Sequence, residues 1–172
     1  MNTLTVLVPF YNEENTILQS LEKLDKLTFI NEVILLNDGS TDESLAIVNK
    51  FCKDRRKYRI LSYEVNKGKG AVLNESREHI NSDYVVIHDA DLEYFPKDLI
   101  EMFKFVDGSN LILGSRFIGN KKRSNIYMRT NIANKIISLF FSFINQKKIT
   151  DVATCYKLMP TSFFKQNNFK EK

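Results

Sequence analysis

Short apolar segments alternate with amphipathic ones along the first 113 residues, and this alternation constrains the fold more than any other feature. Five segments are short and rich in apolar residues, as in buried β-strands: Thr3–Pro9, Glu32–Asn37, Tyr58–Tyr63, Tyr84–His88 and Leu111–Leu113. Between the first two, Leu18, Leu21 and Leu24 recur at helical spacing. The alternation predicts an α/β fold with a mostly parallel sheet covered by helices on both faces.

Local signals place the helices of this predicted fold. Ser40 with Glu43 three residues later has the pattern of a capping box and predicts a helix that runs through Phe51. Pro96 is expected in the first turn of another helix. After Phe117 the alternation stops, and one apolar stripe predicts a helix over Asn131–Ile144. The 172 residues show no repeat and no linker, so we expect one domain over residues 1–172.

The composition is that of an ordinary globular domain. Hydrophobic residues make up 43% and charged residues 27% of the chain, which excludes a disordered protein. Two cysteines make no disulfide framework and fit a reducing compartment. The first residues do not resemble a signal peptide, and the longest nearly apolar run, Ile136–Ile144, is too short to cross a bilayer. We therefore expect a cytoplasmic protein, soluble or peripheral to a membrane.

Positive charge is concentrated near the end of the chain. The formal net charge is +4, but residues 116–172 carry twelve Lys and Arg against two Asp and Glu. Such asymmetry indicates an anionic partner, which would be a phosphate, a nucleic acid or an acidic membrane face. The alternative is a solvated basic surface with no partner.

Three acidic residues follow the fourth predicted strand. In extended backbone residues i and i+2 point to the same side, so Asp89 and Asp91 would face one ligand, and Glu93 would add a third oxygen. Because neighbouring carboxylates repel one another, a divalent cation stabilises them, and oxygen ligands favour Mg²⁺ or Mn²⁺. These three residues are the predicted metal ligands. The alternative is a loop of solvated acids before a helix.

The loops after the other predicted strands carry groups that suit a nucleotide. Tyr11 can stack on a base, while Glu13 and Asp38 can accept hydrogen bonds from ribose hydroxyls and base N–H groups. Lys67 and Lys69 alternate with glycines, which let the backbone approach a phosphate. Helix capping is the alternative role for the polar groups in these loops. Neither a Walker loop nor a complete dinucleotide fingerprint is present.

Two further polar residues are expected to be structural. His88 lies in an apolar strand, which favours a hydrogen-bonded core position over catalysis. Nothing near Cys155 in sequence marks a base, so we expect a small buried residue rather than a nucleophile.

Five motifs follow the predicted strands in order: Pro9-Phe10-Tyr11-Asn12-Glu13, Asn37-Asp38-Gly39-Ser40, Asn66-Lys67-Gly68-Lys69-Gly70, Asp89-Ala90-Asp91-Leu92-Glu93 and Gly114-Ser115-Arg116-Phe117. Together they resemble glycosyltransferase family 2, and more narrowly the dolichol-phosphate mannose synthase group with its bacterial polyprenyl-phosphate relatives. The segment 151–157 resembles a further motif of that group. The resemblance covers nearly the whole chain and implies a GT-A-type, Rossmann-like three-layer sandwich.

The resemblance also implies roles for the residues that match. The nucleotide sugar would be bound by Pro9, Tyr11, Glu13, Leu36, Asp38, Lys69, Asp89 and Ala90. Asp91 would bind the metal and act in catalysis, and Glu93 stands where many relatives have Gln. Ser115, Arg116 and Arg129 would bind the acceptor phosphate, with Arg116 also catalytic.

The predicted activity is inverting transfer of a sugar from a UDP- or GDP-sugar to a polyprenyl or dolichyl phosphate, with Mg²⁺ or Mn²⁺. A phosphate acceptor is already anionic, so it needs cations rather than a general base. Lys121, Lys122 and Arg123 add such cations. Relatives that act on hydroxyls carry a Glu-Asp pair and a Gln-x-x-Arg-Trp motif, and this chain has no Glu-Asp dipeptide and no Trp. Residues 127–145, flanked by further lysines, are predicted to form a helix at the inner membrane face.

Two other functions remain open from the residues alone. A nucleotidyltransferase would need a glycine-rich phosphate loop after the first strand, where this chain has Phe10-Tyr11-Asn12-Glu13-Glu14. A non-catalytic phosphate- or nucleic-acid-binding module would use the basic last third, which contains no recognised motif. We expect no nucleic-acid partner. Because relatives usually continue further, we expect this form to lack the usual C-terminal extension and to bind nucleotide better than it transfers sugar.

Overall fold

The computed structural model describes residues 2–118 and 128–168, and six strands form one sheet within these ranges. The strands are β1 (Leu4–Phe10), β2 (Glu32–Asp38), β3 (Tyr58–Tyr63), β4 (Tyr84–Ile87), β5 (Ile112–Leu113) and β6 (Lys157–Pro160). Their order is β3-β2-β1-β4-β6-β5. The first four are parallel neighbours, whereas β6 runs antiparallel to both β4 and β5. The predicted α/β fold with a mostly parallel sheet is confirmed.

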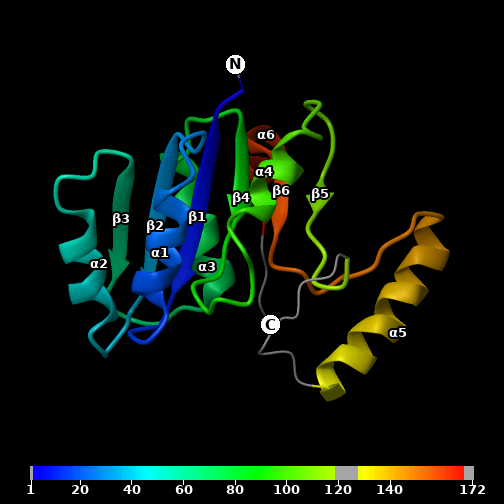
Figure 1. Ribbon diagram of the computed structural model, residues 1–172, viewed down its shortest axis with the longest axis horizontal. Helices are drawn as coiled ribbons and strands as arrows, with labels where there is room; N and C mark the ends of the chain where they lie inside the picture. The colour runs from blue at the N-terminus through cyan, green and yellow to red at the C-terminus, as the bar shows by residue number, and fades with distance from the viewer. Residues whose placement is uncertain (1, 119–127, 169–172) are drawn as a thin grey trace.

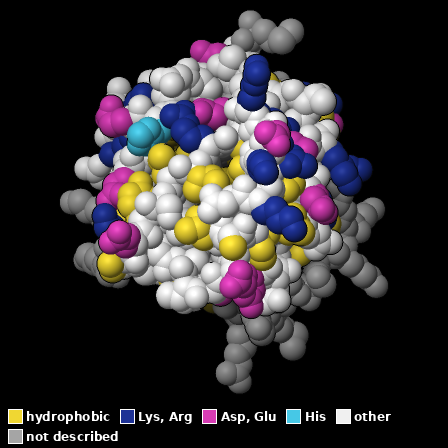
Figure 2. All heavy atoms as spheres, turned by 90° about the vertical axis from the view of Figure 1, so that its left-hand side faces the viewer, with side chains coloured by type: hydrophobic (Ala, Val, Ile, Leu, Met, Phe, Trp, Pro, Cys, Tyr) yellow, Lys and Arg dark blue, Asp and Glu magenta, His cyan; other side chains and the backbone are white. Residues whose placement is uncertain are grey.

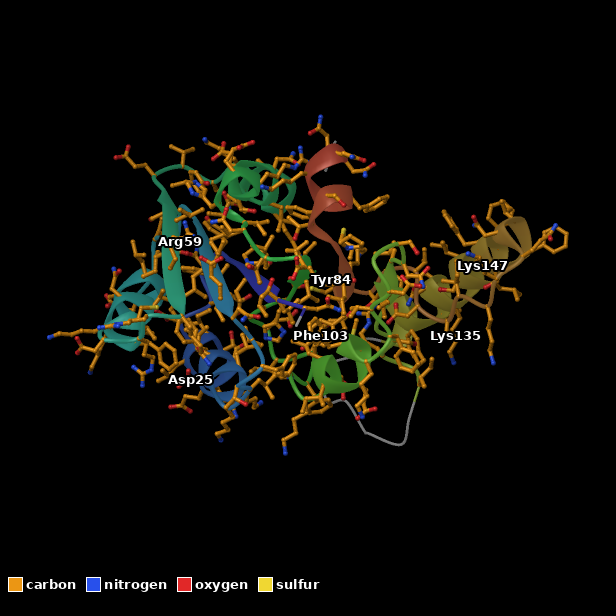
Figure 3. The ribbon with its side chains drawn as sticks, turned by 90° about the horizontal axis from the view of Figure 1, so that it is seen from above. Asp25, Arg59, Tyr84, Phe103, Lys135 and Lys147 are labelled. Carbon is orange, nitrogen blue, oxygen red and sulfur yellow. The ribbon has the colours of Figure 1, made fainter. Side chains whose placement is uncertain are left out.

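Helices cover both faces of this sheet. They are α1 (Ile17–Asp25), α2 (Ser44–Cys52), α3 (Lys69–Glu75), the 3₁₀ helix η1 (Ser76–His79), α4 (Asp98–Phe103), α5 (Met128–Asn145) and α6 (Thr161–Gln166). Seen from above, α1, α2 and α4 lie on one side of the sheet and α3 and α6 on the other (Figure 3). Helix α5 stands apart, beyond the β5 edge (Figure 1). The three-layer sandwich therefore has one helix outside its layers.

The core is built on the central strands. All seven residues of β1 are buried, as are all four of β4 and six of the seven in β2. A strand covered on both faces reads as a continuous apolar run, which is why these segments were recognisable in the sequence. The β3 edge is only partly buried, and Figure 2 shows hydrophobic side chains in the middle of that end of the molecule, with acidic and basic side chains around them. Charged side chains discourage pairing with another chain at such an edge.

Two local predictions were wrong. Helix α2 starts at Ser44, and the side chain of its N-cap residue, Glu43, makes no capping hydrogen bond. The Asp42 carboxylate accepts a hydrogen bond from the Ser44 N–H at 3.0 Å, and the Ser40 hydroxyl accepts one from the Asn12 backbone N–H at 3.1 Å. Strand β6 was not predicted at all, and the predicted strand at residues 111–113 shrinks to two residues that pair with it. Strand β6 is defined by its backbone hydrogen bonds to β4. A segment of four residues carries too little sequence pattern to indicate that pairing.

Helix α5 confirms the predicted helix over residues 131–144. An ordinary surface helix buries its apolar side chains and exposes its polar ones, whereas α5 does the reverse. Its buried residues, among those whose side chains are described, are the polar Asn134 and Ser138. The apolar stripe points outward: Ile132, Ile136, Leu139, Phe140 and Phe143 are all exposed, Phe143 by 84%. Among the described residues, no helix is both long and apolar enough to cross a membrane.

Candidate active site

A pocket opens beyond the carboxyl ends of β1, β2 and β4, where ligands of parallel sheets bind. Its lining residues are Pro9, Phe10, Tyr11, Glu13, Asp38, Asn66, Gly68, Lys69, Asp89, Ala90 and Asp91. The structure thus brings together seven of the eight residues predicted to bind a nucleotide sugar. The eighth, Leu36, is fully buried in β2 and does not line the pocket. Asn66 and Gly68 were recognised as parts of a motif but not predicted as site residues.

Side-chain oxygens fix the loop that carries Tyr11 and Glu13. The Asn12 side chain accepts a hydrogen bond from the Thr41 N–H at 2.8 Å, and the Ser44 hydroxyl accepts one from the Glu13 N–H at 2.7 Å. The loops after β1 and β2 therefore hold each other. Tyr11 itself is 44% exposed at the pocket, a position from which its ring can stack on a base.

Asp38 organises the opposite side of the pocket. It is 4% exposed, and its two carboxylate oxygens accept hydrogen bonds from the backbone N–H groups of Lys67 at 2.7 Å and Gly68 at 3.0 Å. These bonds hold the loop before α3 against the end of β2. The sequence indicated a contact of Asp38 with the nucleoside but gave no sign of this loop-fixing role.

The acidic part of the pocket has paired and unpaired carboxylates. Asp89 forms an ion pair with Lys69, and Glu93 forms one with Arg116 at 3.1 Å. Asp91 makes no ion pair within the described ranges; its Oδ1 accepts a hydrogen bond from the Glu93 N–H at 3.0 Å. The pKa of Asp91 is raised to about 6, mainly by burial and also by the charges of nearby carboxylates. The hydrogen bond from the Glu93 N–H acts in the opposite direction and lowers the pKa. A cation at Asp91 would relieve this unfavourable negative charge.

The predicted set of three metal ligands is not assembled as expected. Within residues 2–118 and 128–168, no three His, Cys, Asp or Glu side chains are grouped so that they could hold a metal ion. The prediction assumed extended backbone from Asp89 to Glu93, but Leu92 has φ 64°, and Glu93 engages Arg116. Asp91 with Asp89 remains the part of the predicted set that lines the pocket.

Arg116 lies outside the pocket lining and is held by a carboxylate. Its Nε and one terminal nitrogen bind the two oxygens of Asp151 at 2.9 and 3.0 Å, and its backbone N–H binds Asp151 at 3.0 Å. The Asp151 side chain is fully buried. Burial alone would raise the pKa of Asp151, but hydrogen bonds from Arg116 and Asn134 outweigh it and lower the pKa.

The other predicted acceptor residues are less well placed or not described. The Ser115 hydroxyl accepts a hydrogen bond from Thr150 at 2.8 Å, so it too is engaged within the protein. Lys121, Lys122 and Arg123 lie outside the described residues, as does the side chain of Arg129. An acceptor-phosphate role for this group stays a prediction.

The structural roles expected for His88 and Cys155 are confirmed. His88 is 1% exposed, and its ring nitrogens lie 2.8 Å from the Ser20 hydroxyl and 2.9 Å from the Tyr156 hydroxyl. Cys155 is 7% exposed, and burial raises the pKa of its thiol, so the thiol is kept in the unreactive protonated form.

Comparison with known proteins identifies the family of the chain. The model of the family described as glycosyl transferase family 2 matches residues 5–167. The chain belongs to glycosyltransferase family 2. The match includes β2 to β6, all of β1 except Leu4, and every described loop of the pocket.

Two relatives of this family member illustrate its range. The chain is 29% identical over 137 residues to the dolichyl-phosphate beta-glucosyltransferase ALG5A of Trichomonas vaginalis, covering 70% of this chain and 42% of that protein. It is 32% identical over 122 residues to the poly-beta-1,6-N-acetyl-D-glucosamine synthase of Staphylococcus epidermidis, covering 69% of this chain and 29% of that protein. The chain thus spans less than half the length of either relative.

A solved structure has the same fold. The glucosyl-3-phosphoglycerate synthase of Mycobacterium tuberculosis, crystallised with Mn²⁺, uridine diphosphate and phosphoglyceric acid, gives a TM-score of 0.71 at 19% identity. The match covers 94% of this chain and 56% of that one. This likeness shows the GT-A glycosyltransferase fold, as predicted.

The loop packing at Gly39 generates a prediction. Gly39 has φ +70°, and a Cβ there would lie 2.6 Å from the Asn66 backbone nitrogen; Gly108 has φ +87° and open space, with the Tyr84 hydroxyl at 3.9 Å. Both Gly→Ala changes carry a similar conformational cost of about 1 kcal/mol. Because Gly39→Ala must also push away a loop of the pocket, we expect it to cost at least about 2 kcal/mol of unfolding free energy and to weaken nucleotide binding. Denaturant unfolding and nucleotide titration would show this, and equal effects of the two variants would contradict it.

Proposed function

We propose that this protein transfers a sugar, with inversion at the anomeric carbon, from a UDP- or GDP-sugar to a polyprenyl phosphate. The observation that carries the proposal is the pocket of a family 2 member in which Tyr11, Asp38, Lys69, Asp89 and Asp91 converge. The first two suit a nucleoside, and the last three suit a metal-bound diphosphate.

The charges of the pocket suit departure of a diphosphate. Lys69, with its ammonium paired to Asp89, lines the pocket and would contact the diphosphate as negative charge develops on it. Asp91 and Asp89 would hold Mg²⁺ or Mn²⁺, which supplies positive charge that stabilises the leaving group. The Mn²⁺ and uridine diphosphate in the mycobacterial crystal structure support this assignment of ion and ligand class.

Two observations support the lipid phosphate as the acceptor. One relative is a dolichyl-phosphate beta-glucosyltransferase. In addition, the outward apolar stripe of α5 lies in the same basic third of the chain as Arg116, where Lys and Arg greatly outnumber acids. Apolar side chains beside cations are typical of a surface that contacts anionic lipid. We therefore also propose that α5 lies at the membrane face where a polyprenyl phosphate is embedded.

A second acceptor class is favoured by one observation. The similarity to a poly-beta-1,6-N-acetyl-D-glucosamine synthase points to a sugar hydroxyl, which needs a base to remove its proton. Incubation of the protein with a panel of UDP- and GDP-sugars and Mn²⁺ would separate the two classes. The acceptors would be polyprenyl phosphate, the free polyprenol and N-acetylglucosamine oligomers. We expect product from polyprenyl phosphate alone, and efficient transfer to the oligomers with none to the lipid phosphate would refute the proposal.

Replacement of Asp91 tests the metal site. Asp91→Asn keeps the shape of the side chain but removes the charge, so we expect metal-dependent transfer to fall about 100-fold or more while the fold is retained. Asp54→Asn, in an exposed turn after α2, is the matched control and should behave as wild type. Nucleotide release measured with and without a chelator checks this; wild-type turnover by Asp91→Asn in chelator would contradict the assignment.

Replacement of the outer stripe tests membrane contact. Leu139 and Phe143 are 73% and 84% exposed on α5, and Val65 and Phe105, in loops elsewhere, are 67% and 69% exposed. We expect Leu139→Ser with Phe143→Ser to reduce binding to vesicles of anionic lipid at least about tenfold, since each side chain loses its apolar transfer energy. Val65→Ser with Phe105→Ser removes a similar apolar area and should change sedimentation with vesicles little. Equal losses in the two double variants would exclude α5 as the contact.

A further inference from the structure

Helix α5 is attached to the rest of the protein through a ladder of polar side chains. Asn134, Ser138 and Ser142 are spaced four residues apart, so they share one face of the helix. Their side-chain oxygens accept hydrogen bonds from the backbone N–H groups of the segment that follows the helix: Ala153 at 3.2 Å, Val152 at 2.9 Å and Ile149 at 2.8 Å, respectively. Among the side chains of α5 that the structure describes, those that face the protein therefore hold the helix by hydrogen bonds, while its large apolar side chains are exposed.

Asn134 differs from the two serines because it also contacts a charged group. Its side-chain N–H donates to Asp151 Oδ1 at 2.7 Å, the oxygen that also accepts from an Arg116 terminal nitrogen at 3.0 Å. Asn134 is 6% exposed and Asp151 is 2% exposed. The hydrogen bond thus continues from α5 through a buried carboxylate to the guanidinium of Arg116.

The guanidinium is held from two sides. On one side, Asp151 accepts hydrogen bonds from Nε and from the terminal nitrogen Nη2, and the Ala153 carbonyl accepts a second bond from Nη2 at 3.3 Å. On the other side, Glu93 accepts a bond from the terminal nitrogen Nη1 at 3.1 Å. Among the described residues, four of its five N–H groups therefore have partners, and the remaining one belongs to the nitrogen that faces Glu93. If Asp151 turned away, the cation would be drawn towards the acidic loop of Asp91 and Glu93.

We propose that Asp151 and Asn134 are positioning residues, which hold Arg116 so that its remaining N–H group is presented to the acceptor phosphate. This inference rests on the proposed function and on the predicted role of Arg116 in binding that phosphate. Asp151 fixes the guanidinium in a bidentate geometry, and Asn134 fixes the carboxylate. The helix with the outward apolar stripe thereby sets the orientation of the arginine that would bind the head of the lipid.

The test compares two substitutions on the same face of α5. Asn134→Ala removes the hydrogen bond to Asp151 and a docking bond from Ala153. Ser138→Ala removes a docking bond from Val152 and the hydrogen bond that its hydroxyl donates to Asn134 at 3.4 Å, but leaves the contact between Asn134 and Asp151 in place. We expect Asn134→Ala to raise the KM for polyprenyl phosphate about tenfold, with the donor KM and nucleotide affinity unchanged. Ser138→Ala should change the acceptor KM less than twofold. In an Arg116→Ala background, Asn134→Ala should have no further effect, because residues that act through one group are not additive.

Other results would overturn the inference. Equal acceptor KM values for Asn134→Ala and Ser138→Ala would mean that Asn134 only docks the helix. A fall in nucleotide affinity with the acceptor KM unchanged would mean that Arg116 instead supports the Asp91 loop through Glu93. Should Asn134→Ala fold poorly, Asp151→Asn keeps the shape and should give the same rise in KM.

Failure of the proposed function would look different. It would appear as no transfer to polyprenyl phosphate by the wild-type protein in the same assay. Thermal unfolding of Asn134→Ala, Arg116→Ala and the double variant tests the positioning contact without any activity. The two side chains are joined through Asp151, so we expect non-additive shifts of Tm, and additive shifts would refute the positioning role.

Discussion

Beyond the ends of parallel strands the backbone loses its ladder partners, and its N–H groups must find other acceptors. Side-chain oxygens supply them here: Asn12 and Ser44 bind the two loops beside Tyr11, and Asp38 binds the loop that leads to Lys69. These few bonds join the loops after β1, β2 and β3 at one side of the pocket. Because these loops are fixed against each other, Tyr11, Asp38 and Lys69, which would contact a nucleotide, are positioned before it binds.

The charged groups of the site fall into two kinds. Asp89 with Lys69, and Asp151 with Arg116, are pairs in which each charge is compensated within the protein. Asp91 is buried enough to have a raised pKa and, in the described part of the chain, forms no ion pair, because the Lys69 ammonium is paired to Asp89. A site that binds a diphosphate through a cation needs such a carboxylate, because phosphate and carboxylate would otherwise repel each other.

Much of the fold follows from local sequence, because β1, β2 and β4 are buried on both faces and carry continuous apolar residues. The carboxyl ends of the strands predict the loops that form the pocket, and the resemblance to glycosyltransferase family 2 implies seven of the residues that line it. The rest depends on contacts distant in sequence. Strand β6 is defined by pairing with β4, Ser40 is taken up by Asn12 instead of capping α2, and the φ of Leu92 sends Glu93 towards Arg116. Asp151 lies 35 residues from Arg116, and no periodic pattern in the sequence indicates that these two side chains pair.

Helix α5 reverses the usual relation between side-chain polarity and folding. Its polar face holds it to the protein, and its exposed isoleucine, leucine and phenylalanine side chains bury little area in the folded chain. Polar replacements along that stripe consequently carry almost no folding penalty. Side chains in the stripe can therefore vary with little effect on folding, while variation at Asn134 and Ser138 is limited by the fold. Within one helix, the buried polar face is constrained by stability and the exposed apolar face is not.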